Sequence, residues 1–334
     1  EVTRATVTLT ITAHTPDPSA VLSPVMVSVA LVVAPGTGTP TGTVAVSRGV
    51  DGCTITLPAT ACSFSPSVAG TAAIAAQYGG DANFAPQSAA PVSHTTTALP
   101  QAITFPPIPD LALGNAPFLV SATASSGLTV SFASATPAVC TVSGNTVALV
   151  GAGTCTITGN QPGNATYAAA LQVDRTFTVG KAVTTLAITG STLASSPALS
   201  PVTVTVALAS GASGVVPPSG AVAVARGSDG CTITLPATSC ALTPTATGTV
   251  DIVASYGGDG NFLPSTASPF AHTATALVQN ITFDAIANQT LGNPPVALSA
   301  TGGASGNPVV FASSTPLVCT LSGSMVTLVG AGMC

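Results

Sequence analysis

Charged side chains are scarce in this sequence. Its 334 residues include 5 Lys or Arg and 10 Asp or Glu, or 4% of the chain, whereas about 25% of the residues in an ordinary globular domain are charged. Nucleic-acid binding needs clustered Lys and Arg to neutralise phosphates, so nucleic acid is not an expected partner. Because the hydrophobic fraction is 46% and the net charge is small, we do not expect a disordered chain either.

Long hydrophobic runs are also missing, although the mean hydropathy is +0.62. A membrane-spanning helix needs about 20 predominantly apolar residues, and the longest apolar stretch, residues 27–34, is strand-sized and includes Ser28. We therefore expect no transmembrane segment in this chain. The first residues, Glu1 to Arg4, lack the basic and then apolar pattern of a signal peptide. The sequence is thus expected to be a mature chain or a piece of a longer one.

Residue patterns for catalysis are absent as well. The sequence has no Trp, 3 Tyr and 3 His, so it lacks the aromatic platforms that sugar-binding sandwiches usually present. No Gly-x-Ser-x-Gly motif accompanies the histidines. We expect no enzyme, no catalytic residue and no cofactor.

Two copies of one long repeat make up the chain. The segment DGCTITLPAT occurs at residues 51–60 and again at 229–238, an offset of 178, and such self-similarity is typical of repeat proteins. Each copy divides into two unlike modules of the size of a small sandwich domain. The predicted boundaries are 1–99 for module A, 100–179 for module B, 180–277 for module A′ and 278–334 for module B′.

Module B′ is shorter than module B. After Cys155, module B continues for 24 residues, from 156 to 179, whereas B′ ends at Cys334, which matches Cys155. We expect the missing strands either to follow in a longer tandem array or to come from a neighbouring chain, as in strand-addition assemblies.

Short runs of alternating apolar and polar residues, bounded by Gly, Pro and Asn, predict β-strands. No run has a sustained helical period, and 28 Pro and 33 Gly interrupt the pattern. These features predict an all-β sandwich for each module. Strands are expected at residues 25–33, 43–47, 72–78, 129–132, 147–150 and 202–208.

The eight cysteines fall two to a module, at spacings of 9, 15, 9 and 15 residues. A zinc site would need Cys-x2-Cys spacing or a nearby His, so we predict disulfides and no metal site. The shorter spacing fits a bridge across a hairpin, and bridges between the chains of a polymer remain an alternative. Disulfides imply an oxidising compartment. The predicted pairs are Cys53 with Cys62, Cys140 with Cys155, Cys231 with Cys240, and Cys319 with Cys334.

The motif Tyr-Gly-Gly-Asp-x-Asn-Phe occurs at residues 78–84 and 256–262. Gly supplies a positive φ and Asp or Asn bonds nearby backbone, so the motif predicts a structural turn. Calcium is the less favoured interpretation, because it needs six to eight oxygen ligands and typically several carboxylates in one loop. The predicted turn residues are Tyr78, Asp81 and Asn83 in module A and Tyr256, Asp259 and Asn261 in module A′.

We interpret the three histidines as structural residues. His94 and His272 occupy the same repeat position and are expected on the last strand of their modules or in the following linker, whereas His14 has Ser191 as its counterpart.

Several segments of the sequence resemble a known protein family. The end of module A, residues 76–86 (AQYGGDANFAP), resembles the closing hairpin of bacterial immunoglobulin-like repeat domains, which occur in tandem in large secreted and surface-anchored proteins. Module B, with QAITF at 101–105, TPAVC at 136–140 and GNATY at 163–167, is similar to a second repeat type that alternates with the first. The resemblance covers essentially the whole chain. It implies tandem immunoglobulin-like sandwiches at the bacterial cell surface, but no shared active site.

Two functions fit this description. The favoured one is a structural extracellular protein, a disulfide-linked stalk or a filament that assembles from copies of itself, because sheet edges with so few charges have little protection against pairing. The alternative is a spacer or binding region of a bacterial adhesin that recognises a host or surface ligand.

Overall fold

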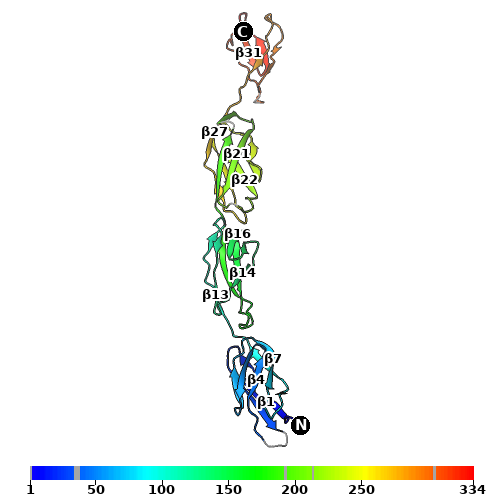
Figure 1. Ribbon diagram of the computed structural model, residues 1–334. Coiled ribbons are helices and arrows are strands. Elements are labelled where there is room, and N and C mark those ends of the chain that lie inside the picture. Colours follow the sequence, from blue (N-terminus) through cyan, green and yellow to red (C-terminus); the bar gives the residue numbers. More distant parts are fainter. Residues whose placement is uncertain (1, 34–37, 192–193, 213, 304–305) are drawn as a thin grey trace. The chain divides into compact units, whose positions relative to one another are not determined.

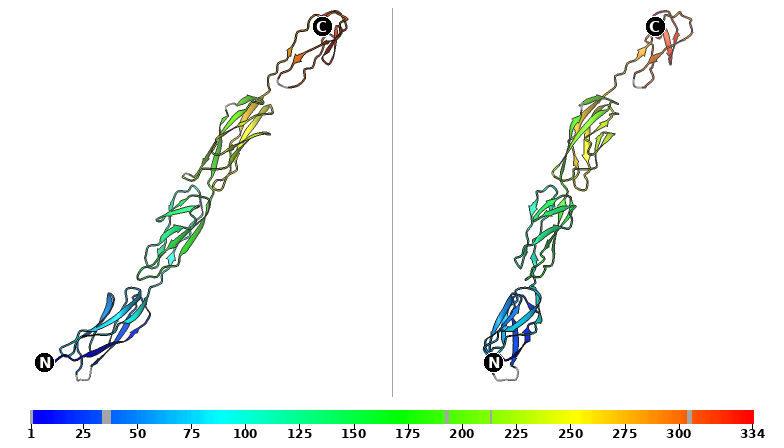
Figure 2. Two further views of the ribbon diagram at one scale, coloured as in Figure 1. Left: turned by 90° about the vertical axis from the view of Figure 1, so that its right-hand side faces the viewer. Right: turned by 45° about the vertical axis from the view of Figure 1, so that its right-hand side comes forward.

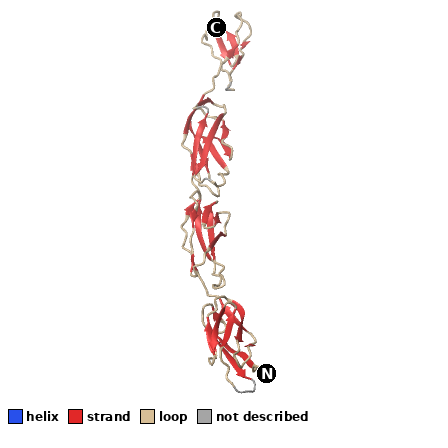
Figure 3. Ribbon diagram, viewed as in Figure 1, coloured by secondary structure: helices blue, strands red, loops and turns tan. Residues whose placement is uncertain are grey.

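The computed structural model describes residues 2–33, 38–191, 194–212, 214–303 and 306–334, and these residues form strands, turns and loops (Figure 3). The chain divides into two compact units, residues 1–181 and 182–334. The described residues contain no helical segment with the length and apolarity that a membrane crossing requires.

Module A contains two facing sheets (Figures 1 and 2). The smaller sheet has the order β1-β3-β6, and the larger has the order β2-β9-β7-β4-β5 with β8 beside β7. The first strand segment lies in one sheet, while β2 crosses to the other and pairs with β9 in parallel. The strands are β1 Val7–Thr15, β2 Ser19–Ala20, β3 Val25–Val33, β4 Thr43–Arg48, β5 Asp51–Thr56, β6 Ala61–Phe64, β7 Gly70–Tyr78, β8 Gln87–Ser88 and β9 Val92–Thr97.

Alternation along these strands fills the space between the two sheets. Strand β4 reads exposed, buried, exposed, buried, which places Val44 and Val46 inside because successive side chains point to opposite faces. Val25, Ile74 and Tyr78 are fully buried in the same core. Burial of an aliphatic side chain of this size stabilises the fold by about 1.5–3 kcal/mol.

Module A′ repeats this topology in the second unit. The sheets have the orders β19-β21-β24 and β20-β27-β25-β22-β23, with β26 beside β25. Even the irregularity in the first strand recurs, at Ile11/Ala13 in β1 and at Ile188/Gly190 in β19. The strands are β19 Thr184–Ser191, β20 Ser195–Pro197, β21 Val202–Ser210, β22 Ala221–Arg226, β23 Asp229–Thr234, β24 Ser239–Leu242, β25 Gly248–Tyr256, β26 Ser265–Thr266 and β27 Phe270–Thr275.

Module B is built from shorter strands in sheets of the orders β11-β18-β17-β14, β12-β16-β15 and β10-β13. Its core includes Phe105, Ile157 and Phe177. The strands are β10 Ile103–Thr104, β11 Leu111–Ala112, β12 Phe118–Leu119, β13 Thr123–Ala124, β14 Ser131–Ser134, β15 Cys140–Ser143, β16 Thr146–Leu149, β17 Gly153–Asn160 and β18 Val173–Gly180.

Module B′ has the two small sheets β28-β30 and β29-β32-β31 among its described residues. In module B, Arg175 of β18 lies over the ring of Phe105, which is 2% exposed. The matching Phe283 is 52% exposed. The strands are β28 Thr282–Phe283, β29 Val296–Ala297, β30 Ala300–Thr301, β31 Cys319–Ser322 and β32 Met325–Leu328.

The chain is therefore all-β, with tandem immunoglobulin-like sandwiches and four disulfides. The bridges join Cys53 to Cys62, Cys140 to Cys155, Cys231 to Cys240 and Cys319 to Cys334. The prediction that the cysteines nine residues apart bridge a hairpin is wrong. Strands β5 and β6 lie in different sheets, so the Cys53–Cys62 bridge ties the two sheets together at one edge of module A.

We predict that the double variant Cys53→Ala/Cys62→Ala destabilises module A by about 3 kcal/mol, because the unfolded chain regains the entropy that the closed loop removes. Hydrogen exchange of β7 amides in the full chain, read by mass spectrometry, measures this loss. Strand β25 in the same molecule retains the Cys231–Cys240 bridge and is the internal control. Unchanged protection in β7 would contradict the prediction.

Candidate functional site

The turn at residues 78–84, here named the closing turn of module A, is held by a single carboxylate. Asp81 Oδ2 accepts hydrogen bonds from the Thr41 amide (2.8 Å) and hydroxyl (2.9 Å), and Oδ1 accepts from the amides of Asn83 and Phe84 (both 2.8 Å). The Tyr78 hydroxyl donates to the Thr41 carbonyl at 2.9 Å. Both carboxylate oxygens of Asp81 therefore bind the protein itself, which favours the turn over the calcium interpretation.

The closing turn of module A′, residues 256–262, has the same contacts. Asp259 accepts from the Ser219 amide and hydroxyl (both 2.8 Å) and from the amides of Asn261 (2.8 Å) and Phe262 (2.9 Å). The Tyr256 hydroxyl donates to the Ser219 carbonyl at 3.0 Å. Gly258 has a φ of 79°, and a Cβ on it would lie 2.7 Å from the Phe262 carbonyl oxygen, so only Gly fits there.

Hydrogen bonds and burial shift the pKa values of the ionisable side chains in these turns. The Thr41 amide, with the other donors, holds the pKa of Asp81 well below its usual range. Burial alone would raise the pKa of Asp259, but the hydrogen bonds from Ser219, Asn261 and Phe262 outweigh it and lower that pKa to about 2. Desolvation and the neighbouring Asp259 raise the pKa of Tyr256 to about 12.

The closing turns also bind the segment that leads into each module. Ala5 donates to the Asn83 carbonyl (2.8 Å) and accepts from the Ala85 amide (2.9 Å), which places it beside Phe84 in a parallel bridge. We name this pair of backbone hydrogen bonds the lead-in bridge. Module A′ has it between Ala182 and the turn at Asn261 and Leu263.

Module B makes a lead-in bridge as well, from a different turn sequence. Leu99 donates to the Thr166 carbonyl and accepts from the Ala168 amide, both at 2.8 Å. Here Asn164 takes the place of Asp, and its Oδ1 accepts from the amides of Thr166 and Tyr167 (both 2.8 Å). Residues 163–167 resemble a known repeat type, but nothing in their pattern indicates the partner, because Leu99 lies 64 to 68 residues away in the chain.

Each of modules A and A′ also has a buried arginine that binds the backbone at the start of β7 or β25. Arg226 is 1% exposed and donates to the carbonyls of Ala246 (3.1 Å) and Gly248 (2.6 Å). Asp229 lies 3.8 Å from Arg226 and accepts from the Thr245 hydroxyl and amide, and the hydroxyl bond is the main cause of its lowered pKa. Arg48 makes the matching bonds to Val68 and Gly70 in module A.

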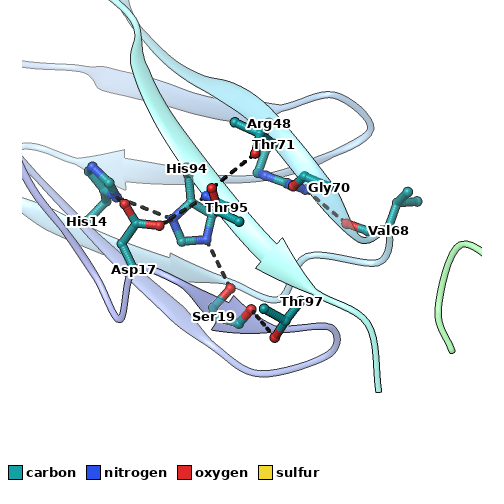
Figure 4. Close-up of polar contacts among 10 residues, drawn as sticks. All are labelled: His14, Asp17, Ser19, Arg48, Val68, Gly70, Thr71, His94, Thr95 and Thr97. Atoms are coloured by element: carbon teal, nitrogen blue, oxygen red, sulfur yellow. Dashed lines mark hydrogen bonds and ion pairs between the residues drawn. The ribbon is translucent and has the colours of Figure 1, made fainter. Parts of the chain in front are cut away.

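A cluster of histidines in module A was not predicted. His14 near the end of β1, Asp17 in the following loop and His94 on β9 come together (Figure 4), and we name them the histidine cluster. The two Nδ1 atoms are 3.3 Å apart, Asp17 Oδ1 is 3.3 Å from His94 Nδ1, and Asp17 Oδ2 is 3.8 Å from His14 Nδ1. The expected position of His94 on the last strand is confirmed, but its partner His14 lies 80 residues away.

Two further contacts hold the histidine cluster in place. Ser19 Oγ lies 2.9 Å from Nε2 of the fully buried His94, and the Thr95 amide donates to Asp17 Oδ1 at 3.0 Å. Burial lowers the pKa of His94; Asp17 opposes this effect, while His14 and Arg48 add to it.

Module A′ keeps only part of this arrangement. His272 is buried and lies 3.3 Å from Ser196 Oγ through Nε2, but Ala194 replaces Asp17. The Thr273 amide donates to the Ala194 carbonyl at 2.9 Å, so the backbone supplies the acceptor that Asp17 supplies in module A. Among the described residues, His272 Nδ1 has no hydrogen-bond partner.

The sequence matches no protein-family profile and no curated protein. Among solved structures, the chain is similar to a tetra-tandem repeat in the extending region of a large adhesion protein, with 15% identity over 98% of this chain and 88% of that one and a TM-score of 0.40. It is also similar to FdeC, an adhesin of Escherichia coli, with 15% identity over 82% of this chain and 98% of that one and a TM-score of 0.27. At such identities, function is inferred from the residues of this chain.

Acid should weaken the closing turns. Folding lowers the carboxyl pKa of Asp259 to about 2, against about 3.9 in an unfolded chain. The stability that this carboxylate contributes is therefore complete above pH ~4 and is lost as the pH falls toward 2. The unfolding temperature of the full chain, measured by calorimetry, should fall over this range.

The variant Asp81→Asn/Asp259→Asn should be less stable than the wild type at pH 7 and should lose less stability between pH 4 and pH 2. The two single variants should each give an intermediate pH slope. Equal slopes for all four proteins would show that these carboxylates do not carry the acid sensitivity.

Proposed function

We propose that this chain is a load-bearing spacer of a bacterial cell-surface adhesin, located outside the cell and without catalytic activity of its own. The lead-in bridge carries the proposal. In modules A, B and A′, the backbone that leads into the sandwich is bound on both its amide and its carbonyl side by the closing turn. Tension applied at the start of a module therefore acts first on these hydrogen bonds.

The repeated charged residues support the same role. Asp81 and Asp259 each accept four hydrogen bonds from their own module, and Arg48 and Arg226 are buried against backbone carbonyls. These side chains stabilise turns instead of facing a ligand. The disulfides support an extracellular location, because such bonds persist in oxidising environments.

Association between copies is the second candidate, and exposed apolar residues favour it. Met26 and Val32 on β3 and Val253 on β25 are 56%, 61% and 45% exposed, and a chain with 4% charged residues has few charges to oppose contact between sheets. Sedimentation velocity across a wide range of chain concentrations separates the two: a spacer stays monomeric, whereas a filament protein forms larger species as its concentration rises.

The spacer role is tested in cells that display the adhesin. Deleting residues 1–334 should lower adhesion, and replacing them with the same number of unrelated immunoglobulin-like domains should restore it at equal surface expression. Adhesion that stays lost after this replacement would show that the chain itself recognises a ligand, and would overturn the spacer proposal.

Ala5→Pro should lower the force at which module A unfolds. Proline has no amide hydrogen, so the variant removes the hydrogen bond to Asn83, which contributes about 1 kcal/mol. Single-molecule stretching of the full chain measures this force, with module A′ in the same molecule as reference. Ala5→Ser keeps the amide at this exposed position and is the matched control. An unfolding force in Ala5→Pro equal to that of the control would contradict a load-bearing lead-in bridge.

A further inference from the structure

The histidine cluster lies at the edge of module A opposite the disulfide. Cys53 and Cys62 join β5 to β6, which are the end strands of the two sheets. At the other edge, His14 extends from β1 and His94 from β9, next to the end strand β2. The cluster therefore spans the same gap between sheets that the disulfide spans, but from the opposite side.

The distances within the histidine cluster fit a metal ion. Zinc binds imidazole nitrogens at about 2.0–2.1 Å in tetrahedral geometry, so two such ligands lie roughly 3.3–3.4 Å apart. The two Nδ1 atoms are 3.3 Å apart, and Asp17 Oδ1 is 3.3 Å from His94 Nδ1. Two imidazoles and one carboxylate, with a position left for water, form the donor set of many zinc sites.

The surrounding hydrogen bonds orient these donors. Metal-bound histidines usually donate their second ring N–H to a neighbouring acceptor, which fixes the ring and the free nitrogen. Ser19 Oγ, 2.9 Å from His94 Nε2, is in position to accept that hydrogen and leave Nδ1 facing His14. The Thr95 amide fixes the carboxylate of Asp17, whose side chain is 36% exposed and leaves the cluster open to solvent.

The repeat supplies a natural comparison. In module A′, His272 and Ser196 are retained, but Ser191 and Ala194 replace His14 and Asp17. Both sandwiches nevertheless have the same strand order. The sandwich therefore forms without the histidine cluster, and His14 and Asp17 are extra features of module A.

We propose that module A binds one divalent transition-metal ion, with zinc as the ion that its donor set suits best, through His14, His94 and Asp17. Bound there, the ion connects β1, the loop after it and β9, and so links the two sheets at the edge that has no disulfide. A metal that binds the folded state alone stabilises it. This site goes beyond the spacer role, since it is specific to one module and independent of what the adhesin recognises.

Titration of the full metal-free chain with Zn²⁺ by calorimetry tests the proposal, with Co²⁺ absorption as a report on tetrahedral geometry. We expect one equivalent to bind, and His14→Ser and Asp17→Ala to weaken binding at least about tenfold. Both variants introduce the residue that module A′ carries, so they are expected to fold, which circular dichroism checks. Asp251→Ala removes an exposed carboxylate of module A′ and is the matched control, expected to bind as the wild type does.

Hydrogen exchange supplies a second measurement. Zn²⁺ should slow exchange in peptides from β1 and β9, while β19 and β27 of module A′ should be unchanged. Absence of binding at about 100 µM Zn²⁺ would overturn the proposal, as would binding that His14→Ser and Asp17→Ala leave intact. In the first outcome, the cluster is a set of polar contacts within module A; in the second, the ion binds elsewhere.

Discussion

In module A, and again in module A′, the contact between two facing sheets holds the sandwich together. The other features of each module act at the margins of this contact. Aliphatic residues such as Val25 and Ile74 in module A and Val202 in module A′ are fully buried there, together with Tyr78 and Tyr256. Burial of each aliphatic side chain contributes about 1.5–3 kcal/mol. The disulfide at the β5/β6 edge and the turns at the ends of the strands add to this contact at its margins.

Scarcity of charge has a structural consequence. A buried ion is costly unless it is paired and hydrogen-bonded, and this chain places its repeated ions beside backbone groups that form hydrogen bonds with them. Arg226 contacts two carbonyls and Asp259 accepts from three amides. Each of these charges is hydrogen-bonded to the backbone of a turn or loop, and the same contacts occur in both copies of the repeat.

Much of the fold could be predicted from the sequence, because the information is local or repeated. Alternation placed a strand at residues 25–33, which is β3, and the recurrence of cysteines limited their pairing. Contacts between segments far apart in the sequence could not be predicted. His14 meets His94 only because β2 pairs with β9 in parallel and brings the loop at Asp17 alongside Thr95. Nothing in the local pattern encodes that register.

The comparison between the two copies separates what the fold needs from what one module has added. The Thr273 amide donates to the carbonyl of Ala194, as the Thr95 amide donates to the carboxylate of Asp17. This backbone amide therefore has an acceptor in both modules. In module A′, the buried Nδ1 of His272 has no hydrogen-bond partner among the described residues, whereas the matching atom of His94 faces an imidazole and a carboxylate. Burying a polar atom without a partner costs about 1–3 kcal/mol, and the contacts of His14 and Asp17 with His94 remove this cost in module A. Neither residue is needed for the strand order that both modules share, and the cation proposed above would bind where they converge on His94 Nδ1.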